Sequence, residues 1–477
     1  MDSADDEWLA DLSGGDMVAH FRARDLSPVE VLEAVHRRVE RLEPSLHALW
    51  AADPDAAREA ARASEQRWAR GEPAGPVDGV PVTVKENLAS RGVPVPVGTA
   101  ATVLVPAEVD SPPVARLREA GAVLLAKTTM PDYGMLSSGL SSFHQLARNP
   151  WDLRWNPGGS SAGAAAAAAA GYGPLHLGTD IGGSVRLPAS WTATVALKPS
   201  LGRVPLGNPW HSRVAGPITR TVADTALMMS VLARPDPVDH MSLPPADLDW
   251  TGLDADVRGL RVGLWTEPGS GLPVDPQTQA RVEAAAQVFA AAGAHVEPLP
   301  PFVDEQMLVD LDLFWRVRSW TDFSALPPQR QEVVLPYIAQ WCRGGAEVTG
   351  VRVMQCVNRL IEIRAATVAA TAPYDLVLSP VSPVPTFPAE WPSPTNDVDR
   401  ALAHIGFTFP FSISEQPASS ISCGVDDQGK AVGLQIAGRR FDDLGVLRAT
   451  AWYEQARPAE SSPDWAALKT RLRALTA

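Results

Sequence analysis

The sequence predicts an α/β fold with a largely parallel or mixed sheet. Segments with helical periodicity alternate with short apolar runs along the 477 residues. No internal repeat is visible, and no linker divides the chain into independent parts. Hydrophobic residues make up 45% and charged residues 20% of the chain, which is typical of a globular protein with a sizeable core.

The first predicted elements are two helices and a strand. Ser27 has the features of an N-cap, because a proline follows it and Glu30 lies at capping-box spacing. We expect Pro44 to end this helix. A charged, Ala-rich helix is predicted from about Asp53 to Arg70. The Val-rich run Gly79–Lys85 then predicts a short strand that ends on a lysine.

Further along the chain, caps and apolar runs alternate in the same way. Prolines and glycines mark where helices begin and end. In chain order the pattern predicts a helix at 111–121, a strand at 122–126, a strand at 260–265, a helix at 275–293, and strands at 295–297, 376–378 and 432–436. This alternation is the basis of the α/β prediction.

One uncharged stretch is long enough to be mistaken for a membrane span. Residues 155–179 contain no Asp, Glu, Lys or Arg. The stretch is rich in glycine, however, and holds a run of seven alanines at 164–170 with few large apolar side chains. We therefore expect a tightly packed, buried helix with Gly-rich ends.

Net charge and cysteine content indicate which partners are excluded and which cellular compartment is expected. The net charge of −14 leaves no basic face for nucleic acid or an anionic membrane. Cys342, Cys356 and Cys423 are odd in number and lie in no metal-ligand spacing, so a reducing compartment is expected. The chain also begins with an acidic run instead of a basic and apolar signal. A cytoplasmic location is therefore predicted.

Two clusters of glycine and serine are candidates for chemistry. They are residues 158–163 and 178–186. Each cluster could simply be a turn, but glycines also let backbone amides approach a ligand and face developing negative charge. No histidine motif supplies a base for a serine. Lys85 is the remaining candidate, because a lysine buried beside serines loses its charge readily, although most lysines are solvated.

These residues closely resemble the amidase signature family. The spacings agree with that family's pattern, with 75 residues from Lys85 to Ser160 and 24 from Ser160 to Ser184. Further matching segments are 85–87, 127–131, 149–151, 197–203, 216–220 and 433–439. The chain departs from many relatives at Ser412 and Glu415, where they carry Asn and Gly.

The resemblance implies a Ser-cisSer-Lys triad. Ser184 would attack the carbonyl carbon, Ser160 would relay the proton, and Lys85 would accept it. The backbone N–H groups of Ile181, Gly182, Gly183 and Ser184 would form the oxyanion hole, at ~3 kcal/mol per donor. Lys85 would need a pKa lowered from about 10.4 to about 7 or 8, with no acidic group touching its amine. The cis peptide at Ser160 is likewise implied by the family.

The family also implies the architecture and its division. The expected fold is a single large amidase signature domain over residues 1–477, with a central mixed β-sheet covered by helices on both faces. The catalytic signature region would span about 79–225. The segment at about 301–371 matches least and is expected to vary with the substrate and to cover it.

Three other functions compete with a Ser-cisSer-Lys amidase. Residues 159–163 also fit the G-x-S-x-G elbow of α/β-hydrolases, with Ser161 as nucleophile, but no good strand precedes them. A glutamine amidase subunit of a tRNA-dependent amidotransferase would share the fold and the triad. A non-catalytic amidase-like binding module would usually have lost triad residues, and all three are present here.

The substrate expectation is a hydrophobic or aryl amide, with esters and carbamates (urethanes) within reach of the same chemistry. Met130, Tyr133, Met135 and Gly159 are the predicted substrate contacts, with Trp315, Trp320 or Trp341 as covers. No cofactor and no metal are expected. The predicted partner is a small-molecule amide, and the chain is expected to be a monomer or a homodimer.

Overall fold

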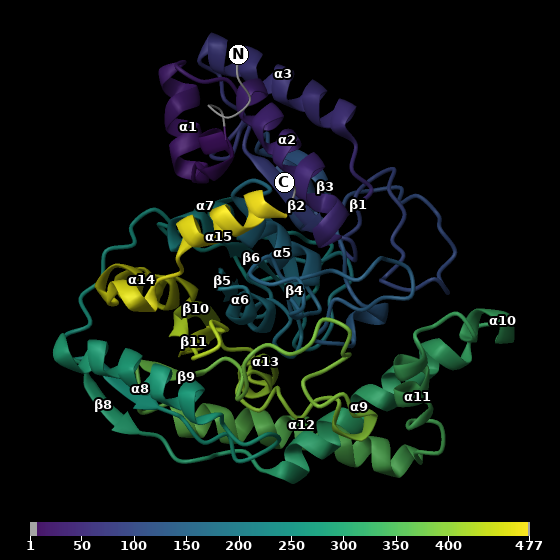
Figure 1. Ribbon diagram of the computed structural model, residues 1–477. Coiled ribbons are helices and arrows are strands. Elements are labelled where there is room, and N and C mark those ends of the chain that lie inside the picture. The colour runs from purple at the N-terminus through teal and green to yellow at the C-terminus, as the bar shows by residue number, and fades with distance from the viewer. Residues whose placement is uncertain (1–6, 476–477) are drawn as a thin grey trace.

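A mixed sheet of eleven strands forms the centre of the computed structural model, which describes residues 7–475 (Figure 1). The strand order is β1-β3-β2-β4-β6-β5-β10-β11-β9-β7-β8. The β2–β3, β2–β4, β7–β8 and β7–β9 pairs are parallel, and the others are antiparallel. The strands are β1 (Leu49–Trp50), β2 (Pro81–Lys85), β3 (Val123–Thr128), β4 (Leu175–Asp180), β5 (Val195–Lys198), β6 (Val214–Thr219), β7 (Arg261–Leu264), β8 (His295–Pro298), β9 (Leu376–Pro380), β10 (Ala418–Val425) and β11 (Ala431–Gly438).

Helices cover both faces of this sheet. One face carries α4, α7, α8 and α14; the other carries α5, α6 and α13, with α9, α11 and α12 beyond them. The longer helices are α1 (Gly14–Ala23), α2 (Pro28–Leu46), α3 (Pro54–Arg70), α4 (Pro112–Glu119), α5 (Ala162–Ala170), α7 (Val222–Leu232), α8 (Pro276–Ala291), α9 (Glu305–Ser324), α11 (Pro336–Arg343), α12 (Gly350–Thr371), α14 (Asp443–Ala456) and α15 (Trp465–Ala474). The short ones are η1 (Glu7–Asp11), η2 (Asp132–Gly134), α6 (Arg186–Trp191), α10 (Pro328–Gln331), η3 (Val398–Arg400), α13 (Phe409–Ile413) and η4 (Ala459–Ser461). The predicted α/β architecture is confirmed.

The capping signals act as the sequence indicates, with one exception. The Ser27 hydroxyl accepts from the Glu30 N–H while the Glu30 carboxylate accepts from the Ser27 N–H, which completes the capping box. The prediction that Pro44 ends this helix is wrong, because α2 continues to Leu46 and is capped by His47. Pro44 lies in the last turn, where its missing N–H and its ring disturb only one hydrogen bond.

The uncharged stretch at 155–179 holds a helix and also a strand. Every residue of α5 is buried, and its small side chains let it lie close to the sheet. At Gly163 a Cβ atom would overlap the carbonyl oxygen of Ala48, so this approach requires glycine. The expectation of a helix alone missed β4, which follows after a tight turn. Within residues 7–475, no helix is both long and apolar enough to cross a membrane.

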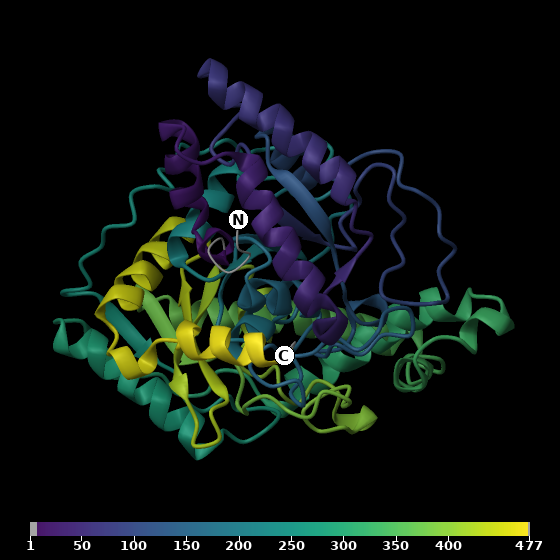
Figure 2. The same cartoon turned by 45° about the horizontal axis from the view of Figure 1, so that its top comes forward.

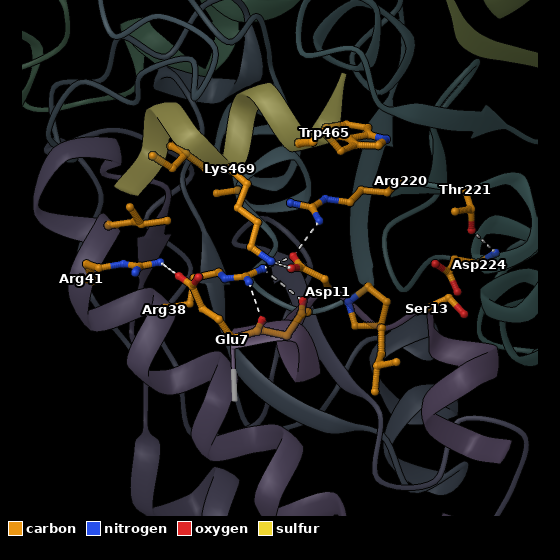
Figure 3. A pocket seen from close by; sticks show the side chains of 18 residues that line it. Glu7, Asp11, Ser13, Arg38, Arg41, Arg220, Thr221, Asp224, Trp465 and Lys469 are labelled. Atoms are coloured by element: carbon orange, nitrogen blue, oxygen red, sulfur yellow. Dashed lines mark hydrogen bonds and ion pairs between the residues drawn. The ribbon is translucent and has the colours of Figure 1, made fainter. Parts of the chain in front are cut away.

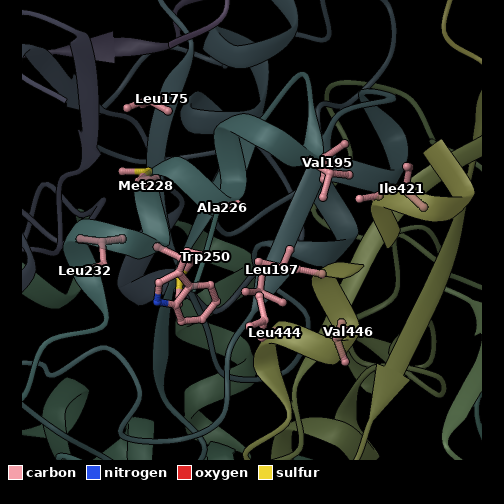
Figure 4. Packing of buried hydrophobic residues seen from close by; sticks show 14 of the residues in the cluster. Leu175, Val195, Leu197, Ala226, Met228, Leu232, Trp250, Ile421, Leu444 and Val446 are labelled. Atoms are coloured by element: carbon pink, nitrogen blue, oxygen red, sulfur yellow. The ribbon is translucent and has the colours of Figure 1, made fainter. Parts of the chain in front are cut away.

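The largest hydrophobic cluster fixes the middle of the sheet to the helices on one face. Figure 4 shows Leu175 of β4 and Leu197 of β5 together with Met228 of α7 and Val446 of α14. All four side chains are fully buried. At about 25 cal/mol per Å² of apolar surface, each such side chain contributes roughly 1.5–3 kcal/mol to folding. Strand β4 is therefore packed firmly into the core just before the loop that carries Ser184.

The two ends of the described chain meet beside the same sheet. Helix α15 lies next to the N-terminal helices (Figures 1 and 2). The Lys469 amine contacts the Asp11 carboxylate at 2.6 Å (Figure 3). Arg473 pairs with Glu7. The acidic run at residues 1–6 lies outside the described residues.

Candidate active site

Parallel pairing brings the candidate lysine next to the second Gly/Ser cluster. Strand β2 ends at Lys85 and β4 ends at Asp180, and the two strands are neighbouring and parallel. The carboxyl ends of parallel strands meet at one edge of a sheet, where ligand sites commonly form. Helix α5 begins close to this edge, with Ser161 as its N-cap.

Lys85 contacts both serines at the start of α5. Its Nζ lies 2.8 Å from Ser160 Oγ and 3.1 Å from Ser161 Oγ. Ser161 Oγ also donates to the Thr179 carbonyl oxygen at 3.2 Å, so this hydroxyl links the lysine to β4. The Gly159–Ser160 peptide bond is cis. Three segments distant in sequence therefore converge on one amine.

The surroundings of Lys85 favour its neutral form. The side chain is fully buried, and burial lowers its pKa to about 7. The positive charge of Arg213 lowers the pKa further, while Asp180 and Glu86 act in the opposite sense. The positive end of the α5 dipole also disfavours an ammonium at this position. A neutral amine here has a lone pair that can accept a proton at physiological pH.

Asp180 shapes the loop that carries Ser184. Its carboxylate accepts from the Gly183 N–H at 2.8 Å and from the Val185 N–H at 3.1 Å. Arg186 makes two further bonds to it, each of 3.0 Å. Burial alone would raise the pKa of Asp180, but the Arg186 guanidinium holds it below its usual value. Asp180 and Arg186 thus fix the backbone of the loop that carries Ser184.

Of the two departures from the family pattern, Ser412 contacts this loop and Glu415 pairs with arginines outside it. Ser412 Oγ accepts from the Arg186 guanidinium at 2.7 Å. Glu415 has a φ of 65°, a conformation that glycine adopts without strain, and pairs with Arg364 and Arg440.

Three backbone N–H groups of the loop are unengaged. Because the Gly183 N–H is donated to Asp180, it is already occupied. The N–H groups of Ile181, Gly182 and Ser184 donate to no acceptor within residues 7–475. Such a set can stabilise an oxyanion next to Ser184.

Ser160 and Ser184 line one cavity of about 280 Å³. The surrounding chain contributes an apolar wall and a polar wall. The apolar wall consists of Val95, Val97, Tyr133, Met135 and Ile181. The polar wall consists of Asn208, Arg213, Arg318, Ser319 and Asp322. Asn87, Gly134, Thr179 and Asp180 complete the lining.

The predicted substrate contacts divide into two groups. Tyr133 and Met135 line the cavity, whereas Met130 and Gly159 are buried beside it without lining it. A Cβ atom on Gly134 would lie 3.1 Å from Met130 Cε and 3.3 Å from Ser160 Oγ, so the Met130 and Ser160 side chains both lie close to Gly134.

The three predicted covering tryptophans do not line the cavity. Trp315 is nevertheless close to the loop, since a Cβ atom on Gly182 would lie 2.7 Å from its ring. Trp341 is buried in the second hydrophobic cluster, and Trp320 packs partly buried against that cluster. Of the segment at 301–371, only α9 reaches the cavity wall.

Sequence reasoning missed Arg213, Arg318, Asn208 and Asp322. None of them belongs to a motif, and a lone arginine is usually a surface charge. Asn87 was available as part of the matching segment 85–87, and its Nδ2 donates to Thr179 Oγ1 at 3.1 Å.

The structural context does not favour Ser161 as a nucleophile. Its side chain is fully buried, lies outside the cavity lining, and is preceded by a turn instead of a strand. No histidine lines the cavity. Over the described range 7–475, no group of three His, Cys, Asp or Glu side chains is arranged to hold a metal ion.

Comparison with known proteins identifies the family. The family model described as Amidase matches residues 30–447. This chain belongs to the amidase signature family. The amidase is 34% identical over 465 residues to an acylamidase of Rhodococcus erythropolis, covering 95% of this chain and 97% of that protein. It is 32% identical to a subunit of the glutamyl-tRNA(Gln) amidotransferase of Myxococcus xanthus (strain DK1622), covering 94% of this chain and 97% of that subunit.

Solved structures agree with this assignment. A bacterial aryl acylamidase of the amidase signature family superposes with a TM-score of 0.86 at 30% identity, covering 97% of this chain and 98% of that one. The 6-aminohexanoate cyclic dimer hydrolase superposes with a TM-score of 0.85 at 27% identity, covering 96% and 99%. The protein is an amide-hydrolysing enzyme.

Proposed function

We propose that this amidase hydrolyses the C–N bond of a carboxylic amide through Ser184, Ser160 and Lys85. The observation that carries the proposal is the 2.8 Å contact of the buried Lys85 amine with Ser160 Oγ, beside the cavity that Ser160 shares with Ser184. The preferred substrates are hydrophobic or aryl linear amides, and esters and carbamates (urethanes) are further substrates. The three free cysteines accord with the proposed cytoplasmic location.

In the first half of the reaction, Ser184 Oγ attacks the carbonyl carbon of the amide. The Ser184 proton passes to Ser160 Oγ as the Ser160 proton passes to Lys85 Nζ. The oxyanion accepts hydrogen bonds from the N–H groups of Ile181, Gly182 and Ser184. When the C–N bond breaks, the proton on Lys85 returns through Ser160 to the leaving amine. An ester on Ser184, the acyl-enzyme, remains.

In the second half, water replaces the amine. The water loses a proton through the same relay as its oxygen attacks the acyl carbon. The bond to Ser184 Oγ then breaks, and Ser184 regains its proton from Ser160. One amide and one water give one acid and one amine, so the enzyme returns to its starting state.

The walls of the cavity support the substrate preference. Val97, Tyr133 and Met135 offer an apolar surface beside the serines, which suits an acyl chain or an aromatic ring. Burial raises the pKa of Tyr133 to about 12, so its phenol stays neutral. In this proposal the segment at 301–371 closes the opposite wall through α9.

Glutamine is the alternative substrate, because the similarity to amidotransferase subunits is nearly as high as that to the acylamidase. Four substrates separate the two functions: 4-nitroacetanilide, 4-nitrophenyl acetate, ethyl N-(4-nitrophenyl)carbamate and glutamine. We expect release of 4-nitroaniline or 4-nitrophenol from the first three. Hydrolysis of glutamine alone would refute the proposed preference and indicate missing partner subunits.

A further inference from the structure

Two arginines of the cavity wall have no carboxylate partner. Arg213 and Arg318 both line the cavity that contains Ser160 and Ser184. Neither guanidinium lies within 4.0 Å of an Asp or Glu oxygen among residues 7–475. Arg213 donates only a weak bond of 3.4 Å to the Asn208 carbonyl oxygen. Arg318 is stacked on the Trp210 ring, with its Cζ 4.6 Å from the ring centroid.

Arg213 and Arg318 lie on or next to elements that contact residues 180–184, the loop with the unengaged N–H groups. Strand β6 pairs with β4 so that Val214 lies opposite Asp180, and Arg213 directly precedes this pair. Helix α9 carries Trp315 against Gly182, and Arg318 follows three residues later, almost one turn along. The two positive charges therefore face the cavity close to the reacting carbonyl.

Partly buried like charges without counterions are costly, so this wall of the cavity favours an anionic ligand. Burial lowers the pKa of Arg213, and the charge of Arg318 lowers it further. Burial also lowers the pKa of Arg318, although Asp322 opposes this effect. Asp180 cannot serve as a counterion, because Arg186 already pairs with it. The cavity is thus left with two cations and one exposed carboxylate, beside a neutral lysine.

We propose that Arg213 and Arg318 form a subsite for a carboxylate carried by the amide substrate. Planar guanidinium groups bind carboxylates with paired, charge-assisted hydrogen bonds. Because apolar side chains also line the cavity, the favoured substrate is a small amide that has a hydrocarbon or aryl part and an acid group. The cavity volume of about 280 Å³ limits such a substrate to a compact molecule. This inference rests on the proposed amidase function and specifies its substrate class.

The test compares anionic amides with neutral amides of the same shape. One pair is 4-acetamidobenzoate and 4-nitroacetanilide, which differ in a carboxylate and a nitro group on the amine side. The other pair is succinic acid monoanilide and 4-methylpentananilide, which differ on the acyl side. The quantity measured is the ratio of kcat/KM for the anionic substrate to kcat/KM for the neutral one. The two substrates differ in intrinsic reactivity by the same factor in every variant, so a change in this ratio between variants reports on the subsite alone.

We expect Arg213→Gln and Arg318→Gln to lower the anionic-to-neutral ratio of at least one pair by about tenfold or more. Asp322→Asn should raise the same ratio, since it removes the only carboxylate of the polar wall. The matched control is Arg70→Gln, because Arg70 is exposed and lies outside the cavity lining. An unchanged ratio for both pairs in both arginine variants would overturn the subsite.

A binding measurement keeps the subsite testable if an arginine variant fails to fold. Calorimetry with the otherwise intact Ser184→Ala protein should detect 4-acetamidobenzoate binding that weakens as NaCl rises, whereas 4-nitroacetanilide binding should change little. Equal salt dependence for both molecules would contradict the subsite. If the native enzyme hydrolyses the anilides but the anionic-to-neutral ratio is the same in the native enzyme and in both arginine variants, only the subsite fails. If it hydrolyses no anilide of either kind, the proposed function fails as well.

Discussion

Two cavities of similar volume differ in whether the cations that line them are paired with carboxylates. The terminal cavity, of about 310 Å³, lies where η1, α2, α5, α7 and α15 meet (Figure 3). Its cations have carboxylate partners: Asp11 contacts Arg38 at 2.5 Å, Arg220 at 3.2 Å and Lys469 at 2.6 Å, and Glu7 pairs with Arg41. The candidate active-site cavity, of about 280 Å³, leaves Arg213 and Arg318 without such partners among residues 7–475.

The difference in charge pairing distinguishes a structural cavity from a candidate ligand site, which the cavity volumes do not. In the terminal cavity the cations pair with Glu7 and Asp11 and tie the chain ends together, so no ligand is required to explain them. Beside the candidate active-site cavity, burial lowers the pKa of Lys85 to about 7, and the two guanidinium groups that line this cavity have no carboxylate partner among residues 7–475. An arrangement of this kind costs folding energy, and function is the usual reason for it.

The largest effect is expected from Ser184→Ala, which removes the proposed nucleophile. Anilide hydrolysis should fall by about 10³-fold or more, because the remaining groups cannot form an acyl-enzyme. Steady-state release of 4-nitroaniline measures the loss. The comparison variant is Ser161→Ala, which leaves the 2.8 Å Lys85–Ser160 contact in place and should reduce activity far less. Greater sensitivity to Ser161→Ala than to Ser184→Ala would reverse the assignment.

Lys85→Met should abolish activity and stabilise the fold. The folded pKa of about 7 lies below the ordinary value of 10.5, so the unfolded chain binds more protons between these pH values. Native stability should therefore rise with pH across this window, and the variant should lack that rise. At pH 7 the gain in unfolding free energy is on the order of a few kcal/mol. Denaturant unfolding at pH 7 and 9 measures it, and a less stable variant would contradict a neutral, buried Lys85.

These two predictions rest on residues that the sequence made visible. Lys85, Ser160 and Ser184 were recognisable because a strand and two Gly/Ser clusters carry them at a family spacing. Strand β4 was hidden, because it adjoins the alanine run and shares its lack of charge. Arg213 and Arg318 were not predictable, since 105 residues separate them and only the packing of β6 and α9 brings both to one wall. The sequence therefore predicts the chemistry better than the specificity.

The pH dependence of kcat/KM tests whether Arg213 acts on the proposed base, Lys85. Activity requires neutral Lys85, so kcat/KM should rise with pH through about 7 and then level off. Arg213→Gln removes a charge that lowers the Lys85 pKa, and should move this rise to higher pH by less than about one unit. Arg318→Gln is the matched control, because Arg318 is not among the charges that shift Lys85. If kcat/KM of Arg213→Gln rose at the same pH as that of the native enzyme, Arg213 would have no influence on the pKa of Lys85.

The smallest effect on activity should come from the terminal cavity, where Asp11→Asn leaves three cations without their shared carboxylate. We expect an unfolding free energy lower by about 2 kcal/mol at pH 7, with activity per folded molecule unchanged. Burial alone would raise the pKa of Asp11, but its cations hold it well below 3.8, so its contribution is complete above that pH and is lost only as pH falls further. The difference in unfolding free energy between native and variant should therefore shrink in strong acid.

The control is Glu72→Gln, which breaks an exposed pair with Arg70 and should have no measurable effect on stability. If Asp11→Asn instead lowered kcat/KM with stability intact, the terminal cavity would be coupled to catalysis and the contrast between the two cavities would no longer hold.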